Sequence, residues 1–328
     1  MNIKRKKSMT TTKTIKNEIL SNLAEIQPCC KVAFLSALFR SAGSIVINNL
    51  GLSVSVASEN LKLVNLLSDI VEEMYGVKCT VSNTPNPIKN TKIYTVAVRD
   101  KNILKETGIL AEVDGLTEII ADIDPYIVSE ECCAKSYITG LFIGCGVVTL
   151  PSLKEESKKI NAGYHFEFFL SSISVAEDLV ALLASKGFKF KTSSRSEGTV
   201  VYVKDSATIS DVLAYMGANK AVLGLQNLLI EKDCRNNANR QSNCITANIG
   251  KSINASEKQL ADIDYVVSQK GWEYFSDQLK AVALARRQNP SANLSELASI
   301  CGGDLTKSGV AHRLRKIAQM AKKLGKTD

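Results

Sequence analysis

The chain has 328 residues, of which 45% are hydrophobic, and this length is enough for two domains or three small ones. It holds 41 Lys and Arg against 33 Asp and Glu, which gives a formal net charge of +8. No apolar run approaches the roughly 20 residues that a membrane helix needs, so a membrane-spanning protein is excluded.

The N-terminal segment, residues 1–27, is basic at first and then amphipathic. It lacks the continuous apolar run and the small-residue cleavage site of a secretory signal, so we expect a cytoplasmic protein. Its basic side chains either attract a polyanion or form a solvating tail, and both interpretations stay open. These bases are Lys4, Arg5, Lys6, Lys7, Lys13 and Lys16.

The next part of the chain contains one pattern twice. Residues 28–125 and 130–218 each read as a helix, two strands, a helix, two strands and a helix, so that LSALFRSAGSIVI at 35–47 corresponds to ITGLFIGCGVVTL at 138–150. This predicts an α+β domain made of two αββαββα units that pack as a pseudo-twofold pair. Matching residues are Leu63, Leu66, Leu67 and Asp100 in the first repeat and Leu179, Leu182, Leu183 and Asp205 in the second.

The leading helices of the two repeats carry small residues at equivalent points, which predicts close helix contact at the pseudo-twofold axis. These residues are Ala37, Ala42, Gly43, Gly140, Gly144 and Gly146. On the nine-residue motifs 35–43 and 138–146, the two helices resemble the LAGLIDADG helices of homing endonucleases. In that family the eighth residue of the motif is an acid that binds the catalytic divalent metal, and the resemblance places Ala42 and Cys145 there.

Alanine offers no ligand, and a thiol is too soft for Mg²⁺, so we expect no catalytic residue, no metal site and no nuclease activity. The nearest carboxylates, Glu130 and Glu131, are expected about two helical turns from Cys145. Residues 17–278 hold 25 bases against 30 acids, which argues against a DNA-gripping saddle, although a basic sheet face remains compatible with that net charge.

Nine cysteines are present, and they include the adjacent pairs Cys29-Cys30 and Cys132-Cys133. No CxxC motif occurs, and the chain has only two histidines. This spacing argues against a zinc site and against a disulfide framework. We therefore interpret the cysteines as reduced and mostly buried small hydrophobes, and we expect no cofactor.

Residues 219–275 join the repeats to the C-terminal segment. The stretch 235–252, RNNANRQSNCITANIGKS, is rich in Asn, Ser and Arg and has no apolar period, which predicts a polar connector whose Asn side chains satisfy backbone groups in an ordered turn. A helix is expected over 255–271. Arg235, Arg240 and Lys251 are candidate phosphate contacts from this segment.

The C-terminal segment, residues 276–328, reads as three short helices. Ser276 and Pro290 bound the first, Asn293 and Glu296 form a capping box at the second, and Gly302 and Gly303 end it. The third opens at Thr306, and its apolar stripe faces a core. The stripe consists of Val310, Leu314, Ile317, Ala318 and Ala321.

A short helix, a turn with glycine and a longer helix with a basic face are typical of a helix-turn-helix, whose second helix lies in the DNA major groove. Ten bases against three acids in residues 279–328 fit this interpretation. Groove-facing candidates are Lys307, Ser308, His312 and Arg315, phosphate candidates are Lys316, Lys322 and Lys323, and Arg313 belongs to the same DNA-binding set.

A LAGLIDADG-like pair without acids followed by a helix-turn-helix resembles the WhiA family of Gram-positive bacteria. The similarity runs from about 28 to 325 and includes the motifs RNNANR at 235–240, NCITAN at 243–248 and KSGVAHRLRKI at 307–317. The resemblance implies a sequence-specific DNA-binding protein of the nucleoid, which regulates transcription in sporulating actinomycetes and serves cell division and chromosome segregation in firmicute-like relatives.

Double-stranded DNA is therefore the expected partner, and the LAGLIDADG-like domain is a candidate platform for a further regulatory protein. Two alternatives remain open at this stage. One is a protein-interaction scaffold with a nonspecific DNA-binding tail, and the other is a divalent-metal-dependent endonuclease, although the sequence lacks the two acids that this chemistry needs.

Overall fold

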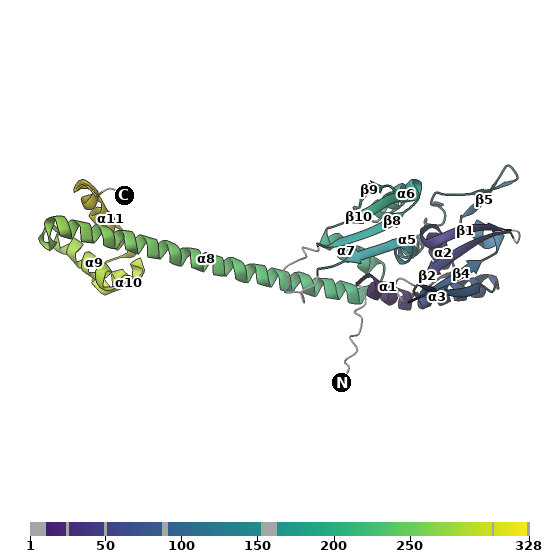
Figure 1. Ribbon diagram of the computed structural model, residues 1–328, viewed down its shortest axis with the longest axis horizontal. Helices are drawn as coiled ribbons and strands as arrows, with labels where there is room; N and C mark the ends of the chain where they lie inside the picture. Colours follow the sequence, from purple (N-terminus) through teal and green to yellow (C-terminus); the bar gives the residue numbers. More distant parts are fainter. Residues whose placement is uncertain are drawn as a thin grey trace, which may run out of the picture. The chain divides into compact units, whose positions relative to one another are not determined.

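The computed structural model of the protein describes residues 11–23, 26–48, 51–86, 91–151, 163–303 and 305–326 (Figure 1). The chain forms two compact units, Met1–Ile230 and Glu231–Asp328, which we call the N-terminal and the C-terminal unit. Each unit has its own hydrophobic core of buried side chains.

The N-terminal unit contains the predicted tandem repeat, so the expected α+β fold is confirmed. The first repeat consists of α2 (Pro28–Ala42), β1 (Gly43–Asn48), β2 (Gly51–Ser58), α3 (Leu61–Tyr75), β3 (Thr80–Asn86), β4 (Thr91–Val98) and α4 (Lys101–Glu106). The second consists of α5 (Glu131–Cys145), β7 (Gly146–Thr149), β8 (His165–Leu170), α6 (Ile173–Ser185), β9 (Lys191–Arg195), β10 (Gly198–Val203) and α7 (Ser206–Tyr215). Helix α1 (Thr11–Asn22) precedes the repeats, and the hairpin β5 (Leu110–Val113) and β6 (Leu116–Ile119) separates them.

The two repeats have the same sheet topology. The strand orders are β1-β2-β4-β3 and β7-β8-β10-β9, and all neighbouring strands are antiparallel. Val54 pairs with Val98 in the first sheet and Phe166 pairs with Val203 in the second, and all four side chains are buried. Because side chains alternate along a strand, these pairs fix which face of each sheet lies on the core.

The residues that match between the repeats play the same structural roles. Asp100 and Asp205 cap the N-termini of α4 and α7, where their carboxylates accept backbone N–H groups. Leu63 and Leu67 in α3 are buried in the core, as are Leu179 and Leu183 in α6. The sequence repeat therefore reflects equal packing.

Helices α2 and α5 lie against each other at the centre of the N-terminal unit, between its two sheets (Figure 1). A Cβ atom added to Gly140 would lie 2.8 Å from the Ala37 Cβ and 2.8 Å from the Phe34 carbonyl oxygen. Real Cβ atoms do not approach other atoms so closely, so only glycine permits this backbone separation. The predicted close contact between the leading helices is confirmed.

The C-terminal unit contains the end of a long helix and three shorter ones. These are α8 (Asn219–Lys270), α9 (Asp277–Gln288), α10 (Leu294–Cys301) and α11 (Lys307–Lys323), with a 3-10 turn at Trp272–Tyr274. Ile263 and Val266 of α8 enter the core of this unit together with residues of the shorter helices.

Helix α8 contradicts the polar connector that we predicted over 235–252, because this stretch is helical throughout. Every residue from 230 to 249 is exposed. A periodic apolar stripe marks a helix only where one of its faces is buried, and this stretch has no buried face. The chain also lacks proline between 219 and 270, so nothing in its covalent structure interrupts the helix.

The basic N-terminal segment includes part of the core. Ile15, Ile19, Leu20 and Leu23 are buried, so α1 is packed on the N-terminal unit. Lys4, Arg5, Lys6 and Lys7 lie outside the described residues. Among the described helices, none combines the length and the apolar content that crossing a membrane requires.

Candidate nucleic-acid interface

Helices α9, α10 and α11 form where local sequence signals predicted them. Asn293 and Glu296 make the expected capping box at α10, with the Asn293 side chain accepting the Ser295 and Glu296 N–H groups. Gly302 and Gly303 have φ of 68° and 69°, a conformation that favours glycine, and they turn the chain towards α11. The Thr306 hydroxyl caps α11 by accepting the Gly309 N–H at 3.2 Å.

One side of α11 is packed and the other is open. Val310, Leu314, Ile317 and Ala321 are buried in the C-terminal core, as their spacing predicted, and Ala318 is half-buried. Ser308, His312, Arg315, Gln319 and Lys322 recur at intervals of four and three residues on the opposite side, and each is exposed. We call this row the open face of α11.

The remaining candidates on α11 flank the open face. Lys316 and Lys323 are exposed beside it, and Lys307 is exposed at the first helical position. Arg313 differs from the others because it is half-buried and donates from its guanidinium to the Gln278 Oε1 of α9 at 3.4 Å. The structure thus brings seven of the eight candidates to the exposed surface of one helix and turns Arg313 towards its neighbour.

Arg286 holds the turn between α9 and α10. Its side chain is only 3% exposed and donates to the carbonyl oxygens of Pro290 at 3.3 Å and Ala292 at 2.6 Å. Burial lowers the pKa of this guanidinium, which still remains charged. Arg286, one of the bases of the C-terminal segment, therefore stabilises this turn and is not available to bind DNA.

The three candidates from the joining segment are placed on α8. Arg235, Arg240 and Lys251 are exposed along this helix, and none belongs to a loop. Their role as phosphate contacts stays a prediction.

The C-terminal ends of α2 and α5 carry the motif positions where the resemblance expects acids. Cys145 is half-buried, donates its thiol to the Leu141 carbonyl at 3.3 Å, and has its pKa raised to about 12 by burial. Lys16 of α1 donates to the Ile143 carbonyl at 2.9 Å, and burial lowers its pKa to about 8. A lysine of the basic N-terminal segment thus places a cation beside the second motif.

We predicted that Glu130 and Glu131 lie about two helical turns from Cys145, and this prediction is wrong. Glu131 begins α5 and Cys145 ends it, which separates them by about 21 Å along a helix of 1.5 Å rise per residue. The Glu131 carboxylate also accepts the Tyr215 hydroxyl at 2.7 Å and pairs with Lys186. Neither acid can join Cys145 in one metal site.

The sheet faces turned away from the core show how much cationic surface the repeats offer. Among the strand residues described, the first sheet has no Lys or Arg on that face, where the register places Ser44, Val46, Ser53, Ser55, Ala57, Thr80, Ser82, Thr84, Ile93, Thr95 and Ala97. The second sheet has Lys191 and Arg195 there, together with Glu167, whose carboxylate lies 3.8 Å from Arg195. Neither face is a strongly basic surface.

The cysteines differ from our expectation of mostly buried residues. Only Cys30 and Cys133 of the nine are buried, and all nine are free thiols. The two adjacent pairs, distant in the sequence, come together in space, where the sulfurs of Cys29, Cys30, Cys132 and Cys133 all lie within 4.8 Å of one another. A signal for this existed in the sequence, because each pair stands the same number of residues before its LAGLIDADG-like motif.

Family models match most of the chain. They are the WhiA N-terminal LAGLIDADG-like domain at residues 28–110, the WhiA LAGLIDADG-like domain at 134–235 and the WhiA C-terminal HTH domain at 238–321.

Curated relatives match over nearly their full length. A probable cell division protein WhiA from Clostridium beijerinckii is 32% identical over 322 residues, which cover 96% of this chain and 99% of the relative. Another from Thermoanaerobacter pseudethanolicus is 35% identical over 300 residues, covering 90% and 92%. The crystal structure of full-length DUF199/WhiA from Thermatoga maritima has the same fold, with a TM-score of 0.58 at 19% identity over 97% of this chain and 100% of that one.

Proposed function

Because the chain belongs to the WhiA family, we propose that it is a sequence-specific DNA-binding protein of the nucleoid that regulates transcription and acts in cell division and chromosome segregation. Its curated relatives carry the name probable cell division protein, and its C-terminal domain belongs to a helix-turn-helix family. Double-stranded DNA is the partner that this domain is built to bind.

The open face of α11 is the observation that carries this proposal. A recognition helix must pack one side on its own domain and present the other to a groove, and α11 divides in this way. Ser308, His312 and Arg315 lie along its N-terminal half, the part that reaches base edges in this motif.

The lysines of α11 would fix the helix on the DNA backbone. Lys316, Lys322 and Lys323 lie further along α11, where contacts to phosphate supply affinity without reading sequence. Lys307 stands at the helix start, where unpaired N–H groups also favour phosphate. Arg313 is assigned to positioning α11 against α9, since its guanidinium already engages Gln278.

We also propose that the LAGLIDADG-like repeats do not cleave DNA. Metal-assisted phosphodiester hydrolysis needs carboxylates to hold Mg²⁺, and the motif positions hold Ala42 and Cys145 instead. The Lys16 ammonium beside the second motif opposes a divalent cation at that place. With little cationic surface on their sheets, the repeats suit a platform for a regulatory protein better than a second grip on DNA.

The test is a selection of bound sequences from a random duplex library, with the full-length chain and with a Ser308→Ala/His312→Ala/Arg315→Ala variant. We expect the full-length chain to enrich one motif, and the variant to lose that motif while it keeps salt-sensitive binding through its lysines. If the full-length chain enriches no motif, the chain is a scaffold with a nonspecific DNA-binding tail. Cleavage of the duplex in Mg²⁺ would refute the absence of nuclease activity.

A further inference from the structure

Two pairs of adjacent cysteines meet at the pseudo-twofold axis of the N-terminal unit. Cys29 and Cys30 lie in the first turn of α2, and Cys132 and Cys133 lie in the first turn of α5. Each pair precedes its motif by the same interval, so the two repeats contribute equivalent residues. The outcome is four thiols from two helices in one place, with all sulfur atoms within 4.8 Å of one another.

The spacing of the sulfurs matches the coordination shell of a single metal ion. In a tetrahedral zinc site with Zn–S bonds of about 2.3 Å, neighbouring sulfurs stand about 3.8 Å apart. The Cys132 and Cys133 sulfurs are 3.9 Å apart. An iron–sulfur cluster spreads its thiolate ligands over several irons that are bridged by inorganic sulfide, so its four ligands stand further apart than those of one ion.

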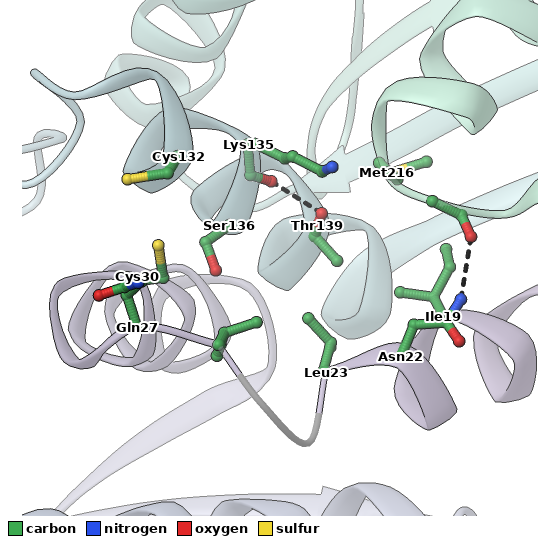
Figure 2. Close-up of a pocket in the computed structure, with 12 residues that line it drawn as sticks. Ile19, Asn22, Leu23, Gln27, Cys30, Cys132, Lys135, Ser136, Thr139 and Met216 are labelled. Atoms are coloured by element: carbon green, nitrogen blue, oxygen red, sulfur yellow. Dashed lines mark hydrogen bonds between the residues drawn. The ribbon is translucent and has the colours of Figure 1, made fainter.

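Packing alone does not account for the cluster. Cys30 and Cys133 are buried, as small hydrophobic side chains usually are, but Cys29 and Cys132 are exposed. A hollow of about 260 Å³ opens beside the cluster, and Cys30 and Cys132 line one end of it (Figure 2). Solvent and ions can therefore reach the sulfurs.

The N-terminal ends of α2 and α5 favour negative sulfur at the cluster, whereas burial raises the pKa of Cys30 and Cys133. The first turn of an α-helix presents unpaired N–H groups and a partial positive charge, and here the starts of α2 and α5 both face the same sulfurs. Neither helix has a side-chain cap, whereas α3, α4, α6 and α7 of the same unit each have one. The uncapped N–H groups of both helices are thus left to interact with negative sulfur.

We propose that Cys29, Cys30, Cys132 and Cys133 bind one zinc ion, which joins the first turns of α2 and α5. Four thiolates select a soft or borderline metal and reject Mg²⁺ and Ca²⁺. A complete set of four protein ligands leaves no open position for water, so the site is structural and does not supply catalysis. It lies at the opposite ends of α2 and α5 from Ala42 and Cys145, about 19 Å along each helix, and is distinct from the nuclease metal position.

The first experiment measures metal bound to the full-length chain, purified without a histidine tag or chelator and in the presence of a thiol reductant. We expect about one zinc ion per chain by inductively coupled plasma mass spectrometry. Cobalt(II) exchanged for zinc should give the visible bands of tetrahedral thiolate coordination. Cys29→Ser/Cys132→Ser, which changes only the two exposed cysteines of the cluster, should lose both signals, whereas Cys244→Ser, at an exposed position of α8, should keep them.

The second experiment needs no variant that might misfold. In the full-length wild-type chain, a zinc-selective chelator should lower the melting temperature of the N-terminal unit by several degrees, and added zinc should restore it, because a ligand bound only to the folded state stabilises that state. Absence of zinc together with absence of the cobalt spectrum would overturn the proposal. So would copper(I) in place of zinc, a disulfide within the cluster under reducing conditions, or unchanged zinc in Cys29→Ser/Cys132→Ser.

Discussion

Removal of two cations beside the open face of α11 should weaken DNA binding by an amount that the salt dependence reveals. Lys316 and Lys323 are both exposed and lie two turns apart on one side of the helix. The substitutions Lys316→Gln and Lys323→Gln keep much of the side-chain length and the helix propensity, so the folded C-terminal unit should be preserved. Only the charge is removed.

The expected magnitude follows from counterion release. Each lysine that neutralises one phosphate contributes about 0.9 to the slope of log K against log salt concentration. The double variant should therefore have a slope smaller by about 1.8. At about 0.15 M salt this corresponds to a loss of roughly 30-fold in affinity, shared by all sequences, because phosphate contacts carry no base information.

Fluorescence anisotropy with a labelled duplex, measured at several salt concentrations, gives both quantities. The matched control is Lys62→Gln/Lys78→Gln, which removes two exposed lysines from the N-terminal unit. The control should leave the slope unchanged. A control that lowers the slope as much as the α11 variant would show that binding depends on net charge alone, and an α11 variant with wild-type slope would place the DNA elsewhere.

Three further outcomes test the packing. Gly140→Ala in α5 should destabilise the N-terminal unit by up to about 2 kcal/mol, since overpacking against Ala37 outweighs the gain in helix propensity. Gly224→Ala in α8, which has open space around it, should instead stabilise the protein by about 0.5–1 kcal/mol. Melting temperatures that shift in the same direction for both variants would contradict the close helix contact. Arg286→Met should lower the free energy of unfolding of the C-terminal unit in urea by about 1–3 kcal/mol, because it leaves two loop carbonyls without a partner. Unchanged stability would mean that the cost of burying the guanidinium charge equals the stabilisation from its hydrogen bonds. The pKa of Lys16 is about 8 in the folded protein against 10.5 for the free side chain, so between these pH values the unfolded chain binds more protons than the folded one. The stability of the wild type relative to Lys16→Met should therefore rise from pH 8 to pH 10.5, by at most about 3 kcal/mol. A stability difference that does not change with pH would contradict a buried ammonium.

The helix-turn-helix could be predicted from sequence because its signals are local. Pro290 cannot continue a helix, Asn293 and Glu296 cap the next one, and Gly302 takes a positive φ that other residues avoid. Each signal acts through atoms within a few residues, so no knowledge of tertiary contacts was needed. The two repeats were predictable for another reason, since equal packing produced equal spacing.

Helix α8 and the cysteine cluster could not be predicted in the same way. Residues 230–249 of α8 are exposed on every side, so the apolar period from which helices are usually recognised is absent. Cys30 and Cys132 are 102 residues apart in the chain, and their meeting depends on how α2 packs on α5. Spacing rules for metal sites consider one segment at a time and therefore miss ligands shared between two repeats.

The pseudo-twofold axis explains why both chemical features of the N-terminal unit occur where α2 meets α5. Only close to this axis do equivalent residues of the two repeats approach each other, so a residue type that both repeats share appears there twice. At the C-terminal ends of the helices this doubling would bring two like charges together if both motifs carried an acid, and a divalent cation would be needed to hold them. Ala42 and Cys145 remove that need.

At the N-terminal ends of α2 and α5 the same doubling assembles four thiols from two short motifs, which neither repeat could achieve alone. A single repeat supplies two sulfurs, too few to close a zinc site, so loss of either pair should abolish metal binding as fully as loss of both.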